Sequence, residues 1–390
     1  MMSAPGLLDD FTVLDLSSVG PASRCSRILA DYGATVIKIG PPPHKAAVQI
    51  EPPYFSYSAG RGMKRTQIDL KAPDGKAVFL RLAAAADVII ESFRPGVVDR
   101  LGIGYEQVRR LNERIVYCST SGYGQSGPSA QWAGHDLNYL AVGGFLDCTG
   151  RRQDGGPPIP GATVADSAGG GMHAAIAIMA ALIKRSRTSK GVHLDVSVAE
   201  GVLFFTSLYI DQYLATGEKP GPGHDVLTGR YACYDVYPAR DGRWLAVGAI
   251  EPAFYANLCR ALGLEQWIPY QTDDARQEEI RGGFRAAFAT RDRDDWVKLL
   301  APANTCVTPV YSIPELIEDP QFLSRKIFVD AAHEAHGRFR QLGPVLAGTD
   351  RTQSTYSVRD SSITDTDELL RGVGVSAQDI EKMRGAGIVA

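Results

Sequence analysis

The sequence predicts an α/β protein with two parts: a large, doubly wound, Rossmann-like domain and a smaller α+β domain. Two observations carry this prediction. Between residues 11 and 119, short apolar runs alternate with stretches of helical spacing, which is typical of a parallel sheet with helices on both faces. After the Gly- and Pro-rich loop at residues 217–223 this alternation ends, and the sequence predicts a β-hairpin followed by several helices in a row. A length of 390 residues suits two or three domains.

The elements of the large domain follow from hydrophobic periodicity. Strands are predicted where apolar runs lie between turn residues, at residues 11–16, 34–39, 87–91, 115–119 and 191–198. Helices are predicted where apolar residues recur every three to four positions, at residues 22–32, 76–86, 97–101, 105–112, 166–185 and 200–216. The helix at 166–185 contains Gly169, Gly170 and Gly171 and is apolar on nearly all sides, so we expect it to be buried.

The smaller domain begins after the loop. Two short strands between residues 231 and 247 flank Asp241-Gly242, a dipeptide that favours a hairpin turn. Helices are predicted to follow at residues 252–262, 277–290 and 293–300. The residues after about 325 are polar and end in a short helix at 377–384.

Composition narrows the class of protein. The formal net charge is −3, from 41 basic and 44 acidic residues, which gives no electrostatic footprint for nucleic acid or an anionic membrane. Six scattered cysteines without a C-x-x-C pair predict reduced thiols and no metal site. The first ten residues lack the features of a signal peptide, and the apolar stretch at 174–183 is shorter than the roughly 20 residues that span a bilayer. We therefore expect a cytoplasmic protein.

Two segments could bind phosphate groups. The turn that contains Gly20 and Pro21 joins the first strand to the first helix, where phosphates often bind, although it is not a G-x-G-x-x-G sequence. Arg94 directly follows a strand, and Lys64 could add a second positive charge. An arginine at the carboxyl end of a parallel strand suits phosphate, and a solvated surface cation is the alternative.

Three polar residues are candidates for chemistry. His135 follows Gly134 and precedes Asp136 at the start of a predicted helix, where backbone N–H groups can stabilise an oxyanion. Asp166 precedes the three glycines, either as a helix cap or as a functional carboxylate. Glu251 lies between a strand and Pro252, and capping and functional roles are equally open for it.

Taken together, these segments resemble the class III CoA-transferase family and, within it, the α-methylacyl-CoA racemases. The resemblance runs from about residue 14 to residue 309. Its family-wide features include Gly20-Pro21, Phe93-Arg94-Pro95-Gly96 and Gly122-Tyr123-Gly124-Gln125. Two further segments look like racemases in particular: Ala133-Gly134-His135-Asp136-Leu137-Asn138-Tyr139 and Val247-Gly248-Ala249-Ile250-Glu251-Pro252.

The resemblance implies a catalytic set and a binding set. His135, supported by Glu251, and Asp166 would be the two bases, and the backbone N–H of Asp136 would stabilise the enolate. The residues expected to bind the CoA part of an acyl-CoA thioester are Arg94, Lys64, Gly20, Pro21 and Tyr123. No metal or redox cofactor is implied, because CoA enters as part of the substrate.

The resemblance also implies an interlocked homodimer of two intertwined chains. The domains would then be the N-terminal part of the large domain at 1–198, a linker helix and loop at 199–228, the small domain at 229–308, and a linker with a C-terminal return to the large domain at 309–390.

Racemisation next to a thioester explains why two bases are needed. One base removes the α-proton from one face of the substrate, and the other returns a proton to the opposite face of the planar enolate. Histidine titrates near neutrality, whereas aspartate needs burial to become a competent acid. The predicted activity is thus racemisation of 2-methyl-branched acyl-CoA thioesters in fatty acid metabolism.

Two other functions stay open. In a CoA-transferase, Asp166 would attack the thioester and form an anhydride before an enzyme-bound thioester. A non-catalytic acyl-CoA-binding protein is the third alternative. Three departures from the racemase pattern weaken the expected CoA pocket: Ala162 in place of Asn, Gly40 in place of an acidic residue or Arg, and Gly60 in place of Asn.

Overall fold

The computed structural model describes residues 6–43 and 53–390, so the first five residues of the segment tested for a signal peptide lie outside it. Its contacts divide the chain into two compact units. The first contains Met1–Gly143, Pro160–Thr206 and Pro320–Ala390, and the second contains Gly144–Ile159 and Ser207–Asp319. These limits differ from the predicted domain limits, because residues 144–159 join the second unit and the first unit resumes at residue 320.

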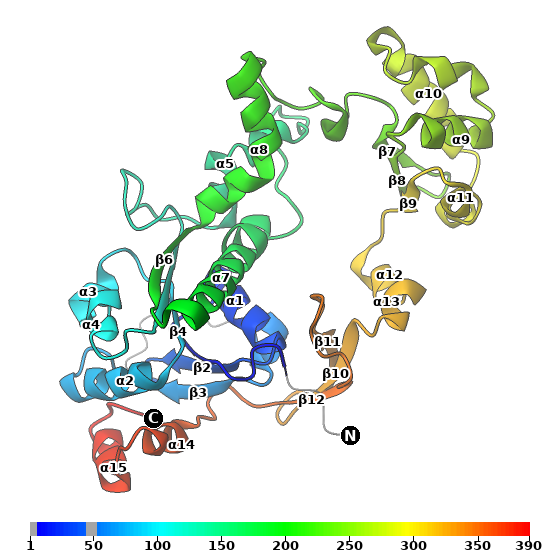
Figure 1. Cartoon of the computed structure of the whole chain (residues 1–390). Helices are drawn as coiled ribbons and strands as arrows, with labels where there is room; N and C mark the ends of the chain where they lie inside the picture. The colour runs from blue at the N-terminus through cyan, green and yellow to red at the C-terminus, as the bar shows by residue number, and fades with distance from the viewer. Residues whose placement is uncertain (1–5, 44–52) are drawn as a thin grey trace. The chain divides into compact units, whose positions relative to one another are not determined.

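A six-stranded parallel sheet forms the centre of the first unit (Figure 1). The strand order is β3-β2-β1-β4-β5-β6, the order of doubly wound nucleotide-binding folds. The strands are β1 (Thr12–Asp15), β2 (Thr35–Gly40), β3 (Lys64–Gln67), β4 (Val88–Glu91), β5 (Val116–Ser121) and β6 (Val192–Ser197). The structure therefore confirms the predicted α/β class and each of the five predicted strands of this sheet.

Helices cover both faces of the sheet. One face packs against α1 (Gly20–Asp31) and α7 (His173–Thr188). The other packs against the helices α2 (Pro73–Ala85), α3 (Val97–Leu101), α4 (Tyr105–Arg109), α14 (Thr366–Gly372) and α15 (Ala377–Gly385). Alternation along each strand produces the two cores: Val13 is buried against α1 and α7, and Leu14 on the opposite face. The last two helices, red in Figure 1, bring the C-terminus back to β3 and α2.

Neither β3 nor a second sheet in this unit was predicted from the sequence. All four residues of β3 are polar, because the strand lies at the sheet edge and carries no apolar alternation. The second sheet has the order β11-β10-β12, with β10 (Phe328–His333), β11 (Gly337–Leu342) and β12 (Thr355–Val358). Most of β11 is exposed, so it shows no buried face in its sequence either.

The predicted helix at 166–185 is real but differs in its first turns. Ala165–Met172 forms a π-helical segment (η3) that continues into α7. Its three glycines are explained by close packing. An added Cβ at Gly170 would lie 2.5 Å from Pro21 Cβ, one at Gly171 would lie 2.8 Å from Arg24 Cβ, and one at Gly201 would lie 1.8 Å from the carbonyl oxygen of Gly169. Another backbone, and not only a ligand, therefore requires this opening.

The same helix and its successor expose apolar side chains. Ile176 and Ile183 of α7 are 63% and 62% exposed, so the expectation that this helix is buried on all sides was wrong. In α8 (Val198–Thr216), Phe204 is 80% exposed and Leu214 is 75% exposed. The continuous segment Ala165–Thr188 is long and apolar enough to cross a bilayer by length and composition alone, so the expectation of a stretch too short to span one, limited to 174–183, was wrong. One side of this helix packs against the sheet, and the other exposes apolar side chains.

The second unit is the predicted α+β part. Its sheet has the order β7-β8-β9, with β7 (Tyr234–Pro238), β8 (Trp244–Gly248) and β9 (Val307–Pro309). The hairpin predicted around Asp241-Gly242 joins β7 to β8, and Gly242 has a φ of +75° in the turn. Tyr237, Phe284 and Phe288 lie in a core formed with α9 (Pro252–Leu262), α10 (Gln277–Phe288) and α11 (Arg293–Leu300).

The remaining elements are short. The helices are α5 (Asp136–Val142), α6 (Phe145–Cys148), α12 (Ile313–Leu316) and α13 (Pro320–Ser324). The 3-10 turns are η2 (Ser56–Gly60), η4 (Val226–Thr228), η5 (Glu265–Tyr270), η6 (Asp274–Arg276) and η7 (Ala301–Ala303).

Candidate active site

Except for Lys64, which begins β3 and so lies at the amino end of a strand, the predicted residues of the first unit follow the carboxyl ends of its parallel strands. Gly20 and Pro21 begin the helix after β1, Arg94 lies three residues after β4, and Tyr123 lies two residues after β5. His135 and Asp166 lie in the long connection between β5 and β6. Carboxyl ends of parallel strands share one edge of the sheet, which is where ligands bind in this class of fold.

His135 is the residue that precedes α5. Its backbone is extended, its N–H donates to Asn138 Oδ1 at 3.0 Å, and its carbonyl accepts from the Asn138 N–H at 2.8 Å. The imidazole is exposed. The N–H groups of Asp136 and Leu137 come before the first intrahelical bond, so they are the ones a helix leaves open for an external acceptor.

The glycine before His135 allows aromatic rings to approach. Tyr139 Oη donates to the carbonyl of Gly134 at 2.6 Å, and a Cβ at Gly134 would lie 2.7 Å from Tyr123 Oη. The rings of Tyr123 and Tyr139 meet edge to face, with centroids 5.3 Å apart. Tyr123 therefore belongs to the wall behind the His135 segment, and Gly134 is required by packing.

Asp166 is joined directly to the His135 segment. Its backbone N–H donates to Asp136 Oδ1 at 2.8 Å, and its own carboxylate is half-buried. Burial raises the pKa of Asp166, and the negative charge of Asp136 raises it further, while Arg24 and His135 oppose the shift. A carboxyl group with a raised pKa is better suited to exchange protons near neutral pH.

Gly20 forms the opposite side of this carboxylate. Its φ of +76° is in the left-handed region that only glycine adopts freely, and its N–H donates to Tyr57 Oη at 2.8 Å. An added Cβ at Gly20 would have one contact in the described part of the chain, with Asp166 Oδ2 at 4.0 Å, besides its own chain neighbours. Gly20 thus borders open space beside Asp166.

Two residues of this cluster were missed from the sequence. Arg24 Nη2 donates to Thr163 Oγ1 at 2.7 Å, and its charge lowers the pKa of Asp166. Its position one helical turn after Gly20 was an available signal. Tyr57 lies 37 residues after Gly20 in an irregular turn, so only the tertiary structure could place it.

Arg94 is held in a rigid turn. The Val97 N–H donates to the Arg94 carbonyl at 3.1 Å, and Gly96 has a φ of +81°, as a type II turn with Pro95 and Gly96 in its centre requires. Its side chain is exposed, without an ion pair in the described residues. Lys64, on the edge strand β3, differs, because its Nζ lies 2.6 Å from Oε1 of Glu368 in α14. Arg94 is therefore the cation of this pair that can accept a phosphate without losing a partner.

Glu91, at the end of β4, is a second residue that sequence reasoning missed. It is 1% exposed, and its Oε2 accepts from the Phe93 N–H at 2.8 Å. Burial raises the pKa of Glu91 to about 7, against hydrogen bonds from Ser119 and Phe93 that lower it. The carboxyl group ties down the turn that carries Arg94. A buried acidic residue at the end of an apolar strand was the available signal.

Glu251 lies in the second unit, whereas His135, Asp136 and Asp166 lie in the first. It occupies the N-cap position of α9, with Pro252 in the first turn, but its side chain makes no capping hydrogen bond and is exposed. The bond that a capping role requires is thus missing, and the predicted support of His135 by Glu251 stays a prediction.

The three positions that depart from the racemase pattern lie in different parts of the first unit. Arg61, beside Gly60, is 3% exposed and binds Asp31 at 2.9 Å and the Leu342 carbonyl at 2.7 Å, so it holds the fold together. Ala162 is exposed in the loop before η3, and Gly40 ends β2.

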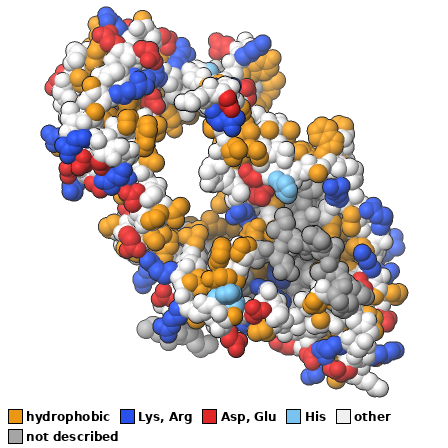
Figure 2. Space-filling model, turned by 180° about the vertical axis from the view of Figure 1, so that it is seen from behind, with side chains coloured by type: hydrophobic (Ala, Val, Ile, Leu, Met, Phe, Trp, Pro, Cys, Tyr) orange, Lys and Arg blue, Asp and Glu red, His pale blue; other side chains and the backbone are white. Residues whose placement is uncertain are grey.

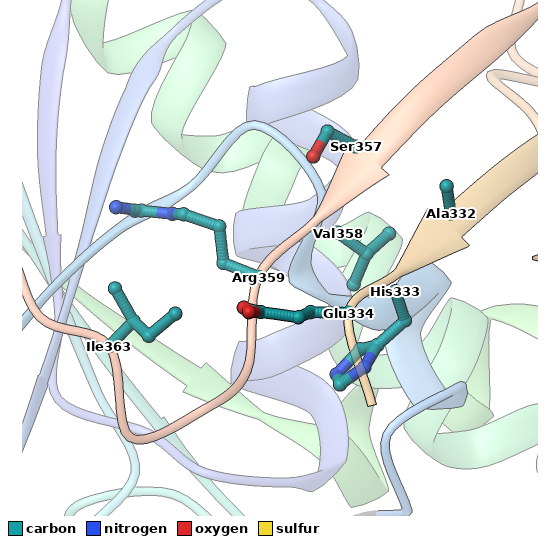
Figure 3. Close-up of a pocket in the computed structure, with 7 residues that line it drawn as sticks. All are labelled: Ala332, His333, Glu334, Ser357, Val358, Arg359 and Ile363. Carbon is teal, nitrogen blue, oxygen red and sulfur yellow. The ribbon is translucent and has the colours of Figure 1, made fainter. Parts of the chain in front are cut away.

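A cavity of about 300 Å³ lies elsewhere in the first unit, at the ends of β10 and β12 (Figure 3). Its lining includes His333, Glu334, Ser357 and Arg359, and none of the predicted site residues. Arg359 is already paired with Asp365 at 2.7 Å. Among the described residues, no three His, Cys, Asp or Glu side chains are grouped as a metal site would require.

Acidic and basic side chains are interspersed on the face of the molecule shown in Figure 2.

Comparisons with known proteins agree on one family. The CoA-transferase family III matches residues 8–359. The chain is 35% identical to the human protein named alpha-methylacyl-CoA racemase over 98% of this chain and 97% of that protein. It is 32% identical to the acetyl-CoA:oxalate CoA-transferase of Acetobacter aceti over 83% of this chain and 86% of that protein. A crystal structure of a CAIB/BAIF family protein from Brucella suis is 26% identical, with a TM-score of 0.76 over 91% of this chain and 96% of that one.

The charges around Asp166 make a first prediction. Asp136→Asn removes a negative charge while its side-chain oxygen can still accept from the Asp166 N–H, so we expect the pKa of Asp166 to fall. Arg24→Gln removes the opposing positive charge, so the pKa should rise. Both are measured by ¹³C NMR titration of the Asp166 carboxyl carbon. Arg109→Gln, an exposed residue of α4 on the other face of the sheet, is the control. Shifts in the same direction for Asp136→Asn and Arg24→Gln would contradict the electrostatic account.

Glu91 makes a second prediction, about stability. Its pKa rises from 4.5 to about 7 on folding, so the folded state binds the proton more tightly. The free energy of unfolding should therefore fall as pH rises from 4.5 to about 7, by up to about 3 kcal/mol at ~1.4 kcal/mol per unit. Glu91→Gln stays neutral and should lose this pH dependence in urea unfolding curves. The Glu106→Gln variant, changed at an exposed residue, should keep the pH dependence of the wild type. If the free energy of unfolding of Glu91→Gln depended on pH as strongly as that of the wild type, Glu91 would not be its source.

Proposed function

The chain belongs to CoA-transferase family III, and we propose that it is a racemase of 2-methyl-branched acyl-CoA thioesters that transfers the α-proton between two bases. The observation that supports this most directly is the joining of His135 to Asp166 through Asp136. The hydrogen bond from the Asp166 N–H to Asp136 Oδ1, at 2.8 Å, holds Asp166 next to the segment that carries the imidazole of His135. Members of the family named as racemases and as transferases are both similar to this chain, so the reaction itself is the proposal.

In the proposed reaction, Arg94 binds a phosphate of the CoA part and the acyl end reaches the space beside Gly20. His135 removes the α-proton of one enantiomer, and the open N–H of Asp136 donates to the enolate oxygen. Donors fixed before the reaction stabilise such an oxyanion by roughly 3–4 kcal/mol each. Asp166, whose raised pKa lets it hold a proton, returns one to the opposite face. Run backwards, the two residues exchange roles.

Three further features of the proposed function are the lack of a redox cofactor, a cytoplasmic location and the support of His135 by Glu251. Proton transfer leaves every oxidation state unchanged, so the proposed reaction needs no redox cofactor, and the expected absence of a metal stays a prediction from the sequence. CoA would enter only within the substrate. A cytoplasmic location and the support of His135 by Glu251 stay predictions from the sequence.

A CoA-transferase is the second candidate. The carboxylate of Asp166 borders the open space at Gly20, where a thioester carbonyl carbon could be attacked as well as an α-proton removed. Asp166 would then form an acyl anhydride, with CoA thiolate as the leaving group, and later carry CoA as a thioester. His135 has no required step in that reaction.

We also propose that the chain acts as a homodimer, as the resemblance implies. Apolar side chains on α7 and α8 are exposed in the single chain: Ile176, Ile183, Leu203, Phe204, Leu208 and Leu214. Exposed apolar surface of this kind marks interfaces in soluble proteins.

Isotope exchange separates the two reactions. In D₂O, we expect α-deuterium in a 2-methylacyl-CoA, detected by mass spectrometry, and loss of optical purity. We expect both His135→Ala and Asp166→Asn to lower racemisation by about 10²- to 10⁴-fold, the usual contribution of a positioned acid or base. His336→Ala, an exposed histidine, is the control. Transfer of CoA onto a free acid, abolished in Asp166→Asn but kept in His135→Ala, would instead establish the transferase.

The dimer makes a further prediction. Sedimentation velocity should give the mass of two chains, about twice the 42.0 kDa of one. Phe204→Glu places a charge at a side chain that is 80% exposed in the monomer, so it should shift the protein toward one chain if Phe204 is covered by a partner. Leu7→Glu, also exposed at 67%, is the matched control. A monomeric wild-type protein would refute the proposal.

A further inference from the structure

Four consecutive residues, 57–60, adopt left-handed backbone conformations. The φ values of Tyr57, Ser58 and Ala59 are +50°, +55° and +57°, and that of Gly60 is +60°. Residues with a Cβ are rare in this region, and three in a row store strain that the surrounding structure must hold. Such strain is concentrated where a side chain has to be placed for function, and the side chains of this turn are therefore candidates for a functional role.

The turn is firmly held on one side. Ala59 is 6% exposed and packs against Ala331 and Val358 of the second sheet, and Ser58 Oγ donates to the Leu342 carbonyl at 3.3 Å. The side chain on the other side is Tyr57. The fold thus fixes the turn through its neighbours and leaves the phenol of Tyr57 to reach toward α1.

The phenol of Tyr57 has an unused donor. Its Oη accepts the Gly20 N–H at 2.8 Å, which occupies an oxygen lone pair and leaves the hydroxyl proton free. No acceptor for that proton occurs among the described residues. The guanidinium of Arg24 lies 5.5 Å from the ring centroid, so the ring is also held from the side.

The free hydroxyl and the Asp166 carboxylate border the same space. Gly20 N is 2.8 Å from Tyr57 Oη, and a Cβ on Gly20 would be 4.0 Å from Asp166 Oδ2 with no other side chain of the described residues within 4 Å. A side chain at position 20 would occupy this space, and glycine keeps it open. Both groups therefore neighbour Gly20, and a ligand that extends from Asp166 past Gly20 would approach the Tyr57 hydroxyl.

We propose that Tyr57 is a further residue of the active site and donates its hydroxyl hydrogen bond to the carbonyl oxygen of the bound thioester. The inference rests on the proposal that the chain binds acyl-CoA, but not on which reaction follows. Asp166 acts at the α-carbon in a racemase and at the carbonyl carbon in a transferase. The carbonyl oxygen is two bonds from the first and one from the second, so in either reaction it stays close to Asp166, and we place it against the Tyr57 hydroxyl, which is then a second donor besides the Asp136 N–H.

The experiment removes the donor and the acceptor in turn. Binding of a 2-methylacyl-CoA is compared with binding of its thioether analogue, in which CH₂ replaces the carbonyl, by isothermal titration calorimetry. Wild type, Tyr57→Phe and Tyr54→Phe are measured with both ligands. Tyr54→Phe makes the same chemical change three residues away, where the ring stacks on His336.

Tyr57→Phe should weaken binding of the thioester by roughly three- to tenfold more than binding of the thioether, as for one neutral hydrogen bond. Tyr54→Phe should weaken neither. Any effect of Tyr57 on the Gly20 turn or on folding acts on both ligands alike and cancels in the ratio.

Two results would overturn the inference, and they are distinguishable. Equal weakening of thioether and thioester binding, or none, means that Tyr57 supports only the Gly20 turn. Failure of the wild-type protein to bind either CoA compound refutes the proposed function itself, and the role of Tyr57 with it.

Discussion

The packing of three glycines fixes the geometry on which the site depends. Gly170 and Gly171 let the start of α7 approach α1, and Gly201 lets it approach α8, at distances that a Cβ would not permit, while a Cβ on Gly169 would lie 3.2 Å from the Val198 carbonyl oxygen. Asp166 lies at the head of the same segment, so this approach places its carboxylate opposite Gly20 and its N–H against Asp136. The segment is π-helical, a conformation that is less stable than an α-helix and is frequent at functional sites. Close backbone packing and the proposed catalytic role of Asp166 thus place the same constraint on this segment.

Electrostatics around Asp166 are set by a balance rather than by a single partner. Burial and Asp136 raise its pKa, while Arg24 and His135 lower it. In the proposed reaction this carboxyl group both accepts and donates a proton, and the opposing influences on its pKa come from different elements of the first unit.

Most of the predicted site residues could be proposed from local sequence, because they stand at turns with unusual composition. Gly20-Pro21, Arg94-Pro95-Gly96 and Gly134-His135-Asp136 each interrupt a regular pattern, and each occupies an end of a strand or helix. Tyr57 and Arg24 were missed for a different reason. Neither stands in such a turn signal, and their proximity to Asp166 depends on contacts between segments separated by up to 139 residues. The polar edge strand β3 escaped prediction because an edge strand needs no apolar face.

By itself, the sequence determined the α/β class, the five main strands of the parallel sheet, the hairpin at Asp241-Gly242 and the identity of the polar residues that end the strands. Those features depend on periodicity and turn chemistry, which are local properties of the chain. Only the tertiary structure decided the strand order, the π-helical opening of α7, the exposure of its outer face and the union of Asp136, Asp166, Gly20 and Tyr57. These arise from contacts between residues far apart in the sequence, and no local pattern records which distant segment a glycine or a carboxylate will meet.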